Sequence, residues 1–373
     1  MIFFEKDKLD SEISKIIDSY KIDELSYSLT LEKKKESCFA LLFAIFLCDL
    51  TSNTNLIFQD KTKTSDKLIE NFFKFSRNRN IFDKSYLQLL TLTLSALYIV
   101  DGDNINFKEK FIKKVESNEI NVFDYLKKFR CLEGKPSSGN YAMFLAIILI
   151  YLDKFLIVDK QKEIDEWVNL HLSNMNIYGF WGKNKNLYAY FQNGYHQYEI
   201  FKYLKTNDTP INIASRSVID LMNNYGGFAP YPGGGACYDY DAIFFLTFQK
   251  KNKLISRDIL NLILENFRKN YFKNLGFSEN TYCRPLNFSN FYKLLTHPLN
   301  KIDQRSSEKF LSSVSLLRKK NEMIKNHFSD NPYYWNKPNL FATWFRVLSI
   351  AKIETQMDIY KKWKFINFPG IGF

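Results

Sequence analysis

The sequence predicts an all-α protein in which almost wholly apolar helices alternate with amphipathic ones. Apolar residues recur at i, i+3, i+4 and i+7 through most of the 373 residues, whereas the period-two alternation of strands is scarce. Apolar segments such as 141–152 alternate with charged ones such as 161–172. No Pro- or Ser-rich linker interrupts the chain. We therefore expect one helical domain over residues 1–373.

The periodicity predicts thirteen helices in order along the chain. Their ranges are 8–19, 31–49, 64–76, 85–99, 107–128, 139–154, 161–172, 192–204, 213–223, 237–249, 256–270, 306–326 and 340–354. A helix that is apolar on all sides is buried, whereas an amphipathic helix covers a core. The two kinds therefore predict an inner and an outer layer.

A repeated turn supports this arrangement. The segments 174–182 (NMNIYGFWG), 223–230 (NNYGGFAP) and 273–280 (KNLGFSEN) each place Asn, Gly and an aromatic residue after an amphipathic helix. Each is explained by a helix C-cap whose aromatic residue fills the gap behind it. Their spacing of about 48 residues fits one αα-hairpin per repeat.

These repeats predict an (α/α) toroid of about six inner and six outer helices. The inner N-termini would then converge on a central cavity, and any site should lie there. The segment 281–335, which combines an irregular stretch (281–300) with an amphipathic helix, is expected to form an inserted loop/helix segment over the mouth of this cavity.

Composition and charge restrict the partners that the chain could bind. The net charge is +12, but the lysines are scattered and form no basic stripe interleaved with aromatics, which argues against nucleic-acid binding. A weak attraction to anionic membrane surfaces remains compatible with this charge. Five cysteines without a CxxC pair, an acidic N-terminus and the lack of a long apolar run predict a cytoplasmic protein with reduced thiols.

The segment 226–246, GGFAPYPGGGACYDYDAIFFL, is the most informative part of the chain. Three consecutive glycines predict a tight turn with close backbone approach. Asp239 and Asp241 follow in the first turn of an apolar helix. First-turn acids are favoured by unpaired N–H groups, which explains both as caps. In a buried helix, however, such acids need a partner or a chemical role.

Polar residues open the other apolar helices as well. His196 is predicted to lie beside Asp241 on an adjacent inner helix and to orient or charge it; the simpler interpretation is an exposed or capping histidine. Arg346 could pair with an inner carboxylate or bind an anionic group of a substrate. Cys237 with these acids is too weak a zinc pattern, so we expect neither a metal nor a cofactor.

The hairpin period, the Gly–aromatic turns and the DYDA segment resemble the terpenoid cyclase/protein prenyltransferase toroid superfamily. Its class II cyclases carry a D-x-D-D motif, which Asp239-Tyr240-Asp241 matches up to Ala242. The resemblance implies Asp241 as proton donor, Asp239 as its supporting neighbour and His196 as activator. It also implies a cavity of cation-stabilising aromatic and polar walls, for which the candidates are Tyr195, Phe228, Tyr238, Phe244, Trp344, Phe345 and Arg346.

The expected function is a class II terpene cyclase-like enzyme that cyclises or isomerises an isoprenoid-type apolar substrate after protonation. The prenyltransferase branch has a zinc-ligating D-x-C-Y, but Gly235 occupies the position of its Asp. The alternatives are a carbohydrate-active (α/α) toroid enzyme (lyase, hydrolase or epimerase) and a non-catalytic scaffold. In the carbohydrate enzyme Tyr195 and His196 would act as acid and base, with Trp181 or Trp344 stacking on the sugar. The oligomeric state stays open.

Overall fold

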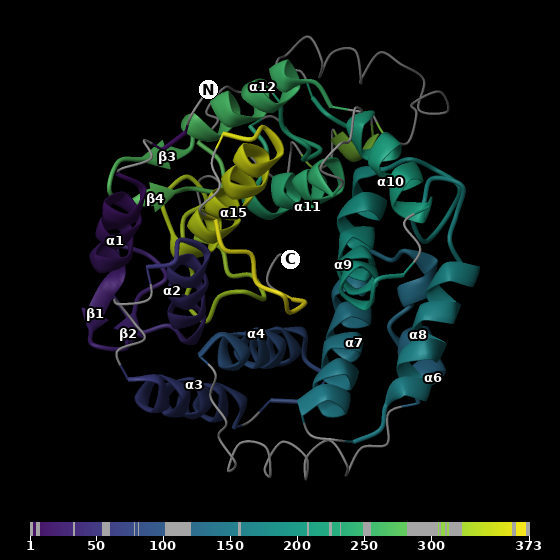
Figure 1. The fold of residues 1–373 in the computed structure, drawn as a ribbon, viewed down its shortest axis with the longest axis horizontal. Coiled ribbons are helices and arrows are strands. Elements are labelled where there is room, and N and C mark those ends of the chain that lie inside the picture. Colours follow the sequence, from purple (N-terminus) through teal and green to yellow (C-terminus); the bar gives the residue numbers. More distant parts are fainter. Residues whose placement is uncertain are drawn as a thin grey trace.

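The computed structural model describes residues 3–4, 8–32, 34–53, 60–77, 79–80, 82–100, 121–155, 158–206, 209–223, 226–231, 233–248, 255–281, 305, 307–309, 312, 323–359 and 363–370. The described elements are mainly helices, which confirms the predicted all-α class (Figure 1). Two short antiparallel hairpins accompany them: β1 (Lys21–Asp23) with β2 (Ser26–Tyr27), and β3 (Tyr271–Phe272) with β4 (Gly276–Phe277).

One set of helices is buried on nearly every side. These are α2 (Cys38–Leu50), α4 (Lys84–Val100), α7 (Ser138–Phe155), α9 (Tyr188–Leu204), α11 (Ala236–Thr247) and α15 (Leu340–Gln356). Each contacts the next one along the chain, and α15 also contacts α2. In Figure 1 they surround a centre into which the chain near its C-terminus runs. A helix that is buried on nearly every side has no solvent-facing stripe on which charged residues could lie, and these helices accordingly carry few charges.

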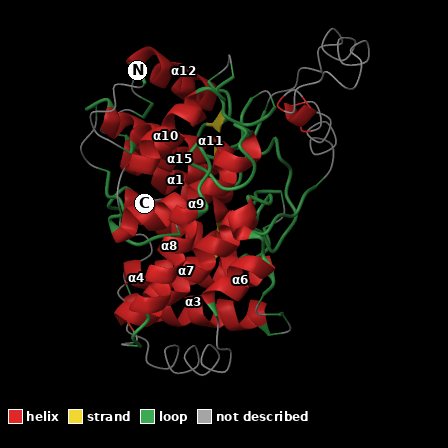
Figure 2. Cartoon of the chain, turned by 90° about the vertical axis from the view of Figure 1, so that its right-hand side faces the viewer, coloured by secondary structure: helices red, strands yellow, loops and turns green. Residues whose placement is uncertain are grey.

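The second set is amphipathic and lies outside the first. Its members are α1 (Leu9–Tyr20), α3 (Lys61–Ser76), α6 (Val122–Lys128), α8 (Gln161–Ser173), α10 (Thr209–Ile219) and α12 (Arg257–Arg268). On α12, for example, Leu260, Ile263, Leu264 and Phe267 form the buried stripe. Figure 1 shows these helices around the buried set, and Figure 2 shows the same helices from the side. Helices α1, α3, α8, α10 and α12 contact α2, α4, α7, α11 and α15 in turn.

Most predicted helices are found within a few residues of their expected ends. The helix predicted over 31–49 begins only at Cys38, because Ser37 caps it by accepting a hydrogen bond from the N–H of Ala40. The helix predicted over 213–223 starts earlier, at Thr209, and ends at Ile219. The first part of the predicted 107–128 helix and most of the 306–326 helix lie outside the described residues.

The three Gly–aromatic turns have the predicted form. Gly179, Gly226 and Gly276 all have positive φ, between 79° and 87°. A Cβ at Gly179 would come within 2.9 Å of the backbone N of Ala214 on α10, so the turn also needs glycine for close helix approach. The aromatic residues that follow, Phe180, Phe228 and Phe277, have no measurable exposure.

Side chains from distant loops cap several buried helices. Asp330 accepts from the N–H of Cys38 at the start of α2, and Glu308 accepts from the first two N–H groups of α9. Glu279 does the same for Ala236 on α11. Glu308 and Asp330 belong to the segment 281–335, whose described residues therefore lie at the N-termini of two buried helices. Whether it covers a cavity mouth stays a prediction, because residues 282–304 are outside the described part.

Residues 363–370 run into the centre that the buried helices surround. The backbone N–H of Lys364 donates to the carbonyl of Leu50, and the Ser95 hydroxyl donates to the carbonyl of Pro369. Phe368 is fully buried and contacts Tyr98, Tyr151, Phe155 and Tyr203. This segment therefore completes the core and bounds the site described next.

Candidate active site

A small cavity lies among the buried helices. Its volume is about 60 Å³, enough for a few water molecules. All six buried helices contribute to its lining, which consists of Phe43, Gln88, Leu92, Asn140, Met143, Gln192, Tyr195, His196, Glu199, Cys237, Asp241, His327, Phe328, Trp344, Phe345 and Gly370. The walls thus combine aromatic and aliphatic surface with a limited set of polar groups.

Asp241 faces this cavity from α11 and is only 3% exposed. Burial raises the pKa of its carboxyl well above 3.8, and the negative charges of Glu199 and Asp239 raise it further. Neither a hydrogen bond nor a cation among the described residues counteracts this shift. Burial therefore favours the protonated form of the Asp241 carboxyl, which faces the cavity.

Two imidazoles share the cavity with Asp241. Asn140 Nδ2 lies 2.9 Å from His196 Nε2, and His196 Nδ1 is buried without a hydrogen-bond partner among the described residues. His327 Nε2 is likewise buried without a described partner. Burial lowers the pKa of His196 to about 3 and that of His327 well below 6.5, so both rings are neutral at physiological pH.

Lys84, the first residue of α4, contributes to this neutrality. Its positive charge lowers the pKa of both His196 and His327. Burial lowers the pKa of Lys84 itself to about 8. Three basic groups thus lie near one small cavity while the two imidazoles stay uncharged.

Glu199 connects α9 to the segment that ends the described chain. Its Oε2 accepts a hydrogen bond from the Tyr195 hydroxyl at 2.8 Å, and its Oε1 accepts from the backbone N–H of Gly370 at 2.8 Å. Gly370 also lines the cavity. One wall of the cavity is therefore part of a loop, and the hydrogen bonds that hold this loop include those from Gly370 to Glu199 and from Ser95 to Pro369.

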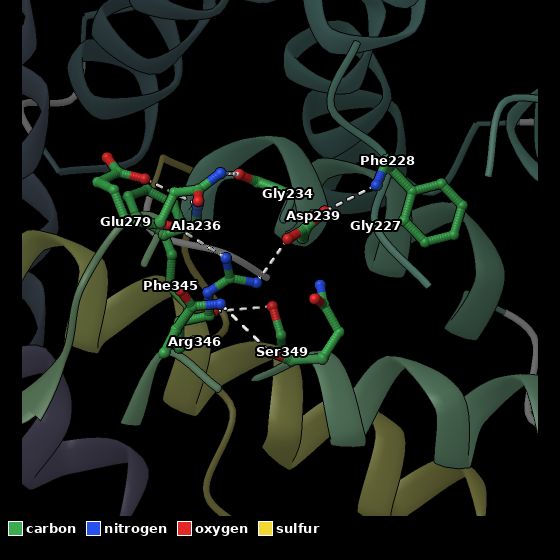
Figure 3. Close-up of polar contacts among 12 residues, drawn as sticks. Gly227, Phe228, Gly234, Ala236, Asp239, Glu279, Phe345, Arg346 and Ser349 are labelled. Carbon is green, nitrogen blue, oxygen red and sulfur yellow. Dashed lines mark hydrogen bonds and ion pairs between the residues drawn. The ribbon is translucent and has the colours of Figure 1, made fainter. Parts of the chain in front are cut away.

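Asp239 has a different environment from Asp241, although the two are two residues apart. It is fully buried, and its Oδ2 pairs with Arg346 Nη1 at 2.5 Å (Figure 3). Its Oδ1 accepts from the backbone N–H of Phe228 at 2.8 Å. Arg346 Nη2 donates in turn to the carbonyl of Glu279. Burial raises the pKa of Asp239 and the Arg346 charge opposes that rise. Residues i and i+2 of a helix point to different sides, which explains why Asp239 meets Arg346 while Asp241 faces the cavity.

The glycine-rich turn makes room for this ion pair. Gly233 and Gly234 have φ of 87° and 74°. A Cβ on Gly234 would lie 2.2 Å from Asp239 Oδ2, and the Gly234 carbonyl accepts from Asn280 Nδ2. The close approach that three consecutive glycines predict is thus made to the Asp239 carboxylate.

The structure divides the ten predicted site residues into two groups. The first group lines the cavity and consists of Asp241, His196, Tyr195, Trp344 and Phe345. The remaining five, Asp239, Phe228, Tyr238, Phe244 and Arg346, are not among its lining residues. Of the two roles foreseen for Arg346, the geometry matches pairing with a carboxylate, and neither it nor Asp239 is placed to contact a substrate in the cavity.

Two details of the carbohydrate alternative need correction. Trp181 is 1% exposed and lies against His171 and Tyr198, and its Nε1 donates to the carbonyl of His171, so it offers no face to a sugar. The Tyr195 hydroxyl donates to Glu199, and burial raises its pKa well above 10. It is therefore a poor acid or base for a pair with His196.

Sequence reasoning assigned no role to His327, Lys84, Gln88 or Gln192. His327 directly follows the helix predicted over 306–326, and nothing in the sequence places the end of that helix at the cavity. Gln88 and Gln192 lie inside apolar helical patterns, where an isolated amide is the only available signal. Among the described residues, no group of three or more His, Cys, Asp or Glu side chains is arranged to hold a metal ion.

Comparison with protein-family models, with curated proteins and with solved structures finds no match to this chain. No helix among the described residues has the length and apolar character needed to cross a bilayer.

Proposed function

We propose that the chain is an (α/α) toroid enzyme that starts the cyclisation or isomerisation of an isoprenoid-type apolar substrate by protonating it from Asp241. The observation that carries this proposal is the Asp241 carboxyl group, which faces a small aromatic-walled cavity and whose burial favours the protonated form. Support for the toroid comes from the chain-order contacts of the buried helices, including the contact between α15 and α2.

Protonation of an alkene requires a donor that still holds its proton, in a site that excludes water, because water quenches the resulting cation. Asp241 meets the first need, because its raised pKa keeps the proton on the carboxyl, and the developing cation would stabilise the carboxylate that the transfer leaves. Phe43, Phe328, Trp344 and Phe345 meet the second need and offer π-faces to positive charge. A cyclisation ends by loss of a proton. Neutral His196 and His327 each have a buried ring nitrogen with no hydrogen-bond partner among the described residues, and these nitrogens are suited to accept it.

The supporting roles differ from those that the family resemblance implies. Asp239 acts at a distance, by fixing the Phe228 turn and Arg346, and its negative charge raises the pKa of Asp241. His196 is neutral, so it does not increase the acidity of Asp241 through a positive charge. Its place in the reaction is as a hydrogen-bonding or proton-accepting group.

The cavity volume sets a condition on this function. Cavities that hold drug-sized ligands measure about 300–1,000 Å³, whereas this one measures about 60 Å³. A polyprenyl chain therefore enters only if part of the wall moves. The wall segment 363–370 is the natural candidate, because it meets the cavity through Gly370 and its hydrogen bond to Glu199.

A second candidate function rests on the polar side of the lining. Gln88, Asn140 and Gln192 place amide groups beside Asp241 and the imidazoles, and Trp344 supplies a ring. Amides and a stacked ring are what a sugar needs, and Asp241 would then protonate a glycosidic oxygen as general acid.

The test incubates the purified protein in D₂O with linear isoprenoid hydrocarbons, alcohols and diphosphates, and in parallel with oligosaccharides. We expect a cyclised or isomerised product that carries deuterium at the carbon protonated by Asp241. Asp241→Asn should lose at least about 10³-fold in rate, whereas Asp165→Asn on the outer helix α8 should retain full activity. Turnover of oligosaccharides but not of isoprenoids would refute the isoprenoid function and support the second, carbohydrate-directed function. Isoprenoid turnover that Asp241→Asn leaves unchanged would refute the role of this acid.

A further inference from the structure

A second pocket lies at the other end of the same helices. It measures about 270 Å³ and is lined by Lys202, Thr247, Lys352, Thr355, Gln356, Phe365, Ile366 and Asn367. Lys202 follows Glu199 by one turn of α9, and Lys352 follows Phe345 by two turns of α15. Glu199 and Phe345 line the central cavity, so the two pockets succeed each other along these helices. Asn367 is exposed, so this lysine pocket reaches the surface.

Two ammonium groups meet at one aromatic ring in this pocket. Lys202 Nζ lies 5.5 Å from the centroid of the Phe244 ring, and Lys352 Nζ lies 5.7 Å from the same centroid. Lys352 also lies 5.0 Å from the centroid of Phe365, on the segment 363–370. Aromatic faces attract both cations, but they do not separate the like charges from each other.

The helix dipole accounts for only one of these lysines. Lys202 is in the last turn of α9, where a cation interacts favourably with the terminal carbonyls. Lys352 is four residues before the end of α15 and is only 8% exposed.

The electrostatics of the pocket favour an anion. Burial lowers the pKa of Lys202 to about 8, and burial together with the Lys202 charge lowers the pKa of Lys352 well below 10.5. Glu199 opposes both shifts. An anion placed between the two ammonium groups would stabilise their charged forms in the same way and from closer range.

We propose that the lysine pocket binds a phosphoryl group, either as inorganic phosphate or as a phosphate monoester. A phosphate dianion matches two ammonium groups in charge, and lysine binds phosphate as a point charge without a fixed geometry. Gln356 lies in the same lining. This site is separate from Asp241 and does not depend on the reaction proposed for the central cavity.

Calorimetric titration of the full chain with sodium phosphate at pH 7.5 tests the proposal, with sodium acetate at equal ionic strength as the competing anion. We expect saturable phosphate binding and no binding of acetate. Lys352→Met and Lys202→Met should each weaken phosphate binding at least tenfold. Lys127→Met, which removes an exposed lysine of α6, should bind as wild type does. Circular dichroism of each variant confirms that it is folded; Met has a volume similar to that of Lys, so both variants should fold.

Proton linkage provides a second measurement that a structural role would not move. Bound phosphate raises the pKa of the pocket lysines, so binding at pH 8.5 takes up protons, and the apparent enthalpy depends on the buffer. That uptake should disappear in the Lys202→Met and Lys352→Met double variant. Wild-type protein that binds no phosphate at tens of millimolar, binds acetate equally well, or keeps its affinity after both substitutions would overturn the proposal.

Discussion

Arg346 on α15 and Asp239 on α11 form a fully buried ion pair, with 2.5 Å between Nη1 and Oδ2. The pair joins two neighbouring buried helices, and its outer hydrogen bonds extend to the Phe228 turn and to the carbonyl of Glu279 (Figure 3). The segment 226–246, Glu279 and α15 are thus fixed at one point. Asp241, two residues further on, keeps its position at the cavity because α11 is held there.

Breaking this pair should destabilise the protein strongly. Arg346→Met leaves the Asp239 carboxylate buried without its cation, and we expect a loss of about 3–5 kcal/mol in the free energy of unfolding measured with urea. Lys63→Met, which breaks the exposed pair with Glu24, serves as the control and should change little. If Arg346→Met unfolds at the same urea concentration as wild type, the pair does not hold the helices together.

Gly234→Ala should have a comparable effect by a different route. The new Cβ would lie 2.2 Å from Asp239 Oδ2, and the backbone at φ 74° disfavours a side chain. We expect a loss of at least about 2 kcal/mol, because the carboxylate has to move away from Arg346. The thermal midpoint measures this loss. Combining Gly234→Ala with Arg346→Met should cost less than the sum of the two, since both disrupt one interaction.

Asp241→Asn should preserve or increase stability at pH 7. The pKa of Asp241 is raised in the folded protein, so above pH 3.8 the unfolded chain ionises while the folded protein retains its proton. Stability therefore falls as pH rises from 3.8 towards the folded-state pKa, and the asparagine, which does not ionise, escapes that loss. Urea unfolding at pH 7 and pH 4 should show the variant's advantage shrinking at the lower pH. A variant clearly less stable than wild type at pH 7 would contradict the protonated state.

Acid should destabilise the protein through His171. This ring is fully buried on α8, its Nδ1 lies 2.7 Å from the carbonyl oxygen of Trp167, and burial lowers its pKa to about 3. The unfolded chain takes up a proton near pH 6.5 and the folded protein does not, so stability is lost as pH falls from 6.5 towards 3. One such histidine contributes a slope of up to about 1.4 kcal/mol per pH unit. His171→Phe should reduce the slope of unfolding free energy against pH by that amount, whereas an unchanged slope would show that His171 titrates normally.

The sequence alone predicted the features that depend on local periodicity and backbone geometry. The alternation of apolar and amphipathic helices follows from a 3.6-residue pattern, which is visible without any neighbour. The Gly–aromatic turns were predicted for the same reason, because only glycine adopts φ near 80° without strain, as Gly179, Gly226 and Gly276 do. The proximity of Asp241 and His196 followed from placing two adjacent buried helices side by side.

Tertiary structure decided which of two similar acids meets Arg346 and which meets the cavity. Asp239 and Asp241 have the same chemistry and nearly the same position in the sequence, and only the positions of α15 and the Phe228 turn give the first an ion pair and leave the second without one. Tertiary structure also decided that His327 and Gly370 line the central cavity and that Lys202 and Lys352 share the lysine pocket, because these residues come from distant parts of the chain. Local pattern fixes which face of a helix is buried, but a charge's partner depends on contacts between distant segments, and those exist only in the folded chain.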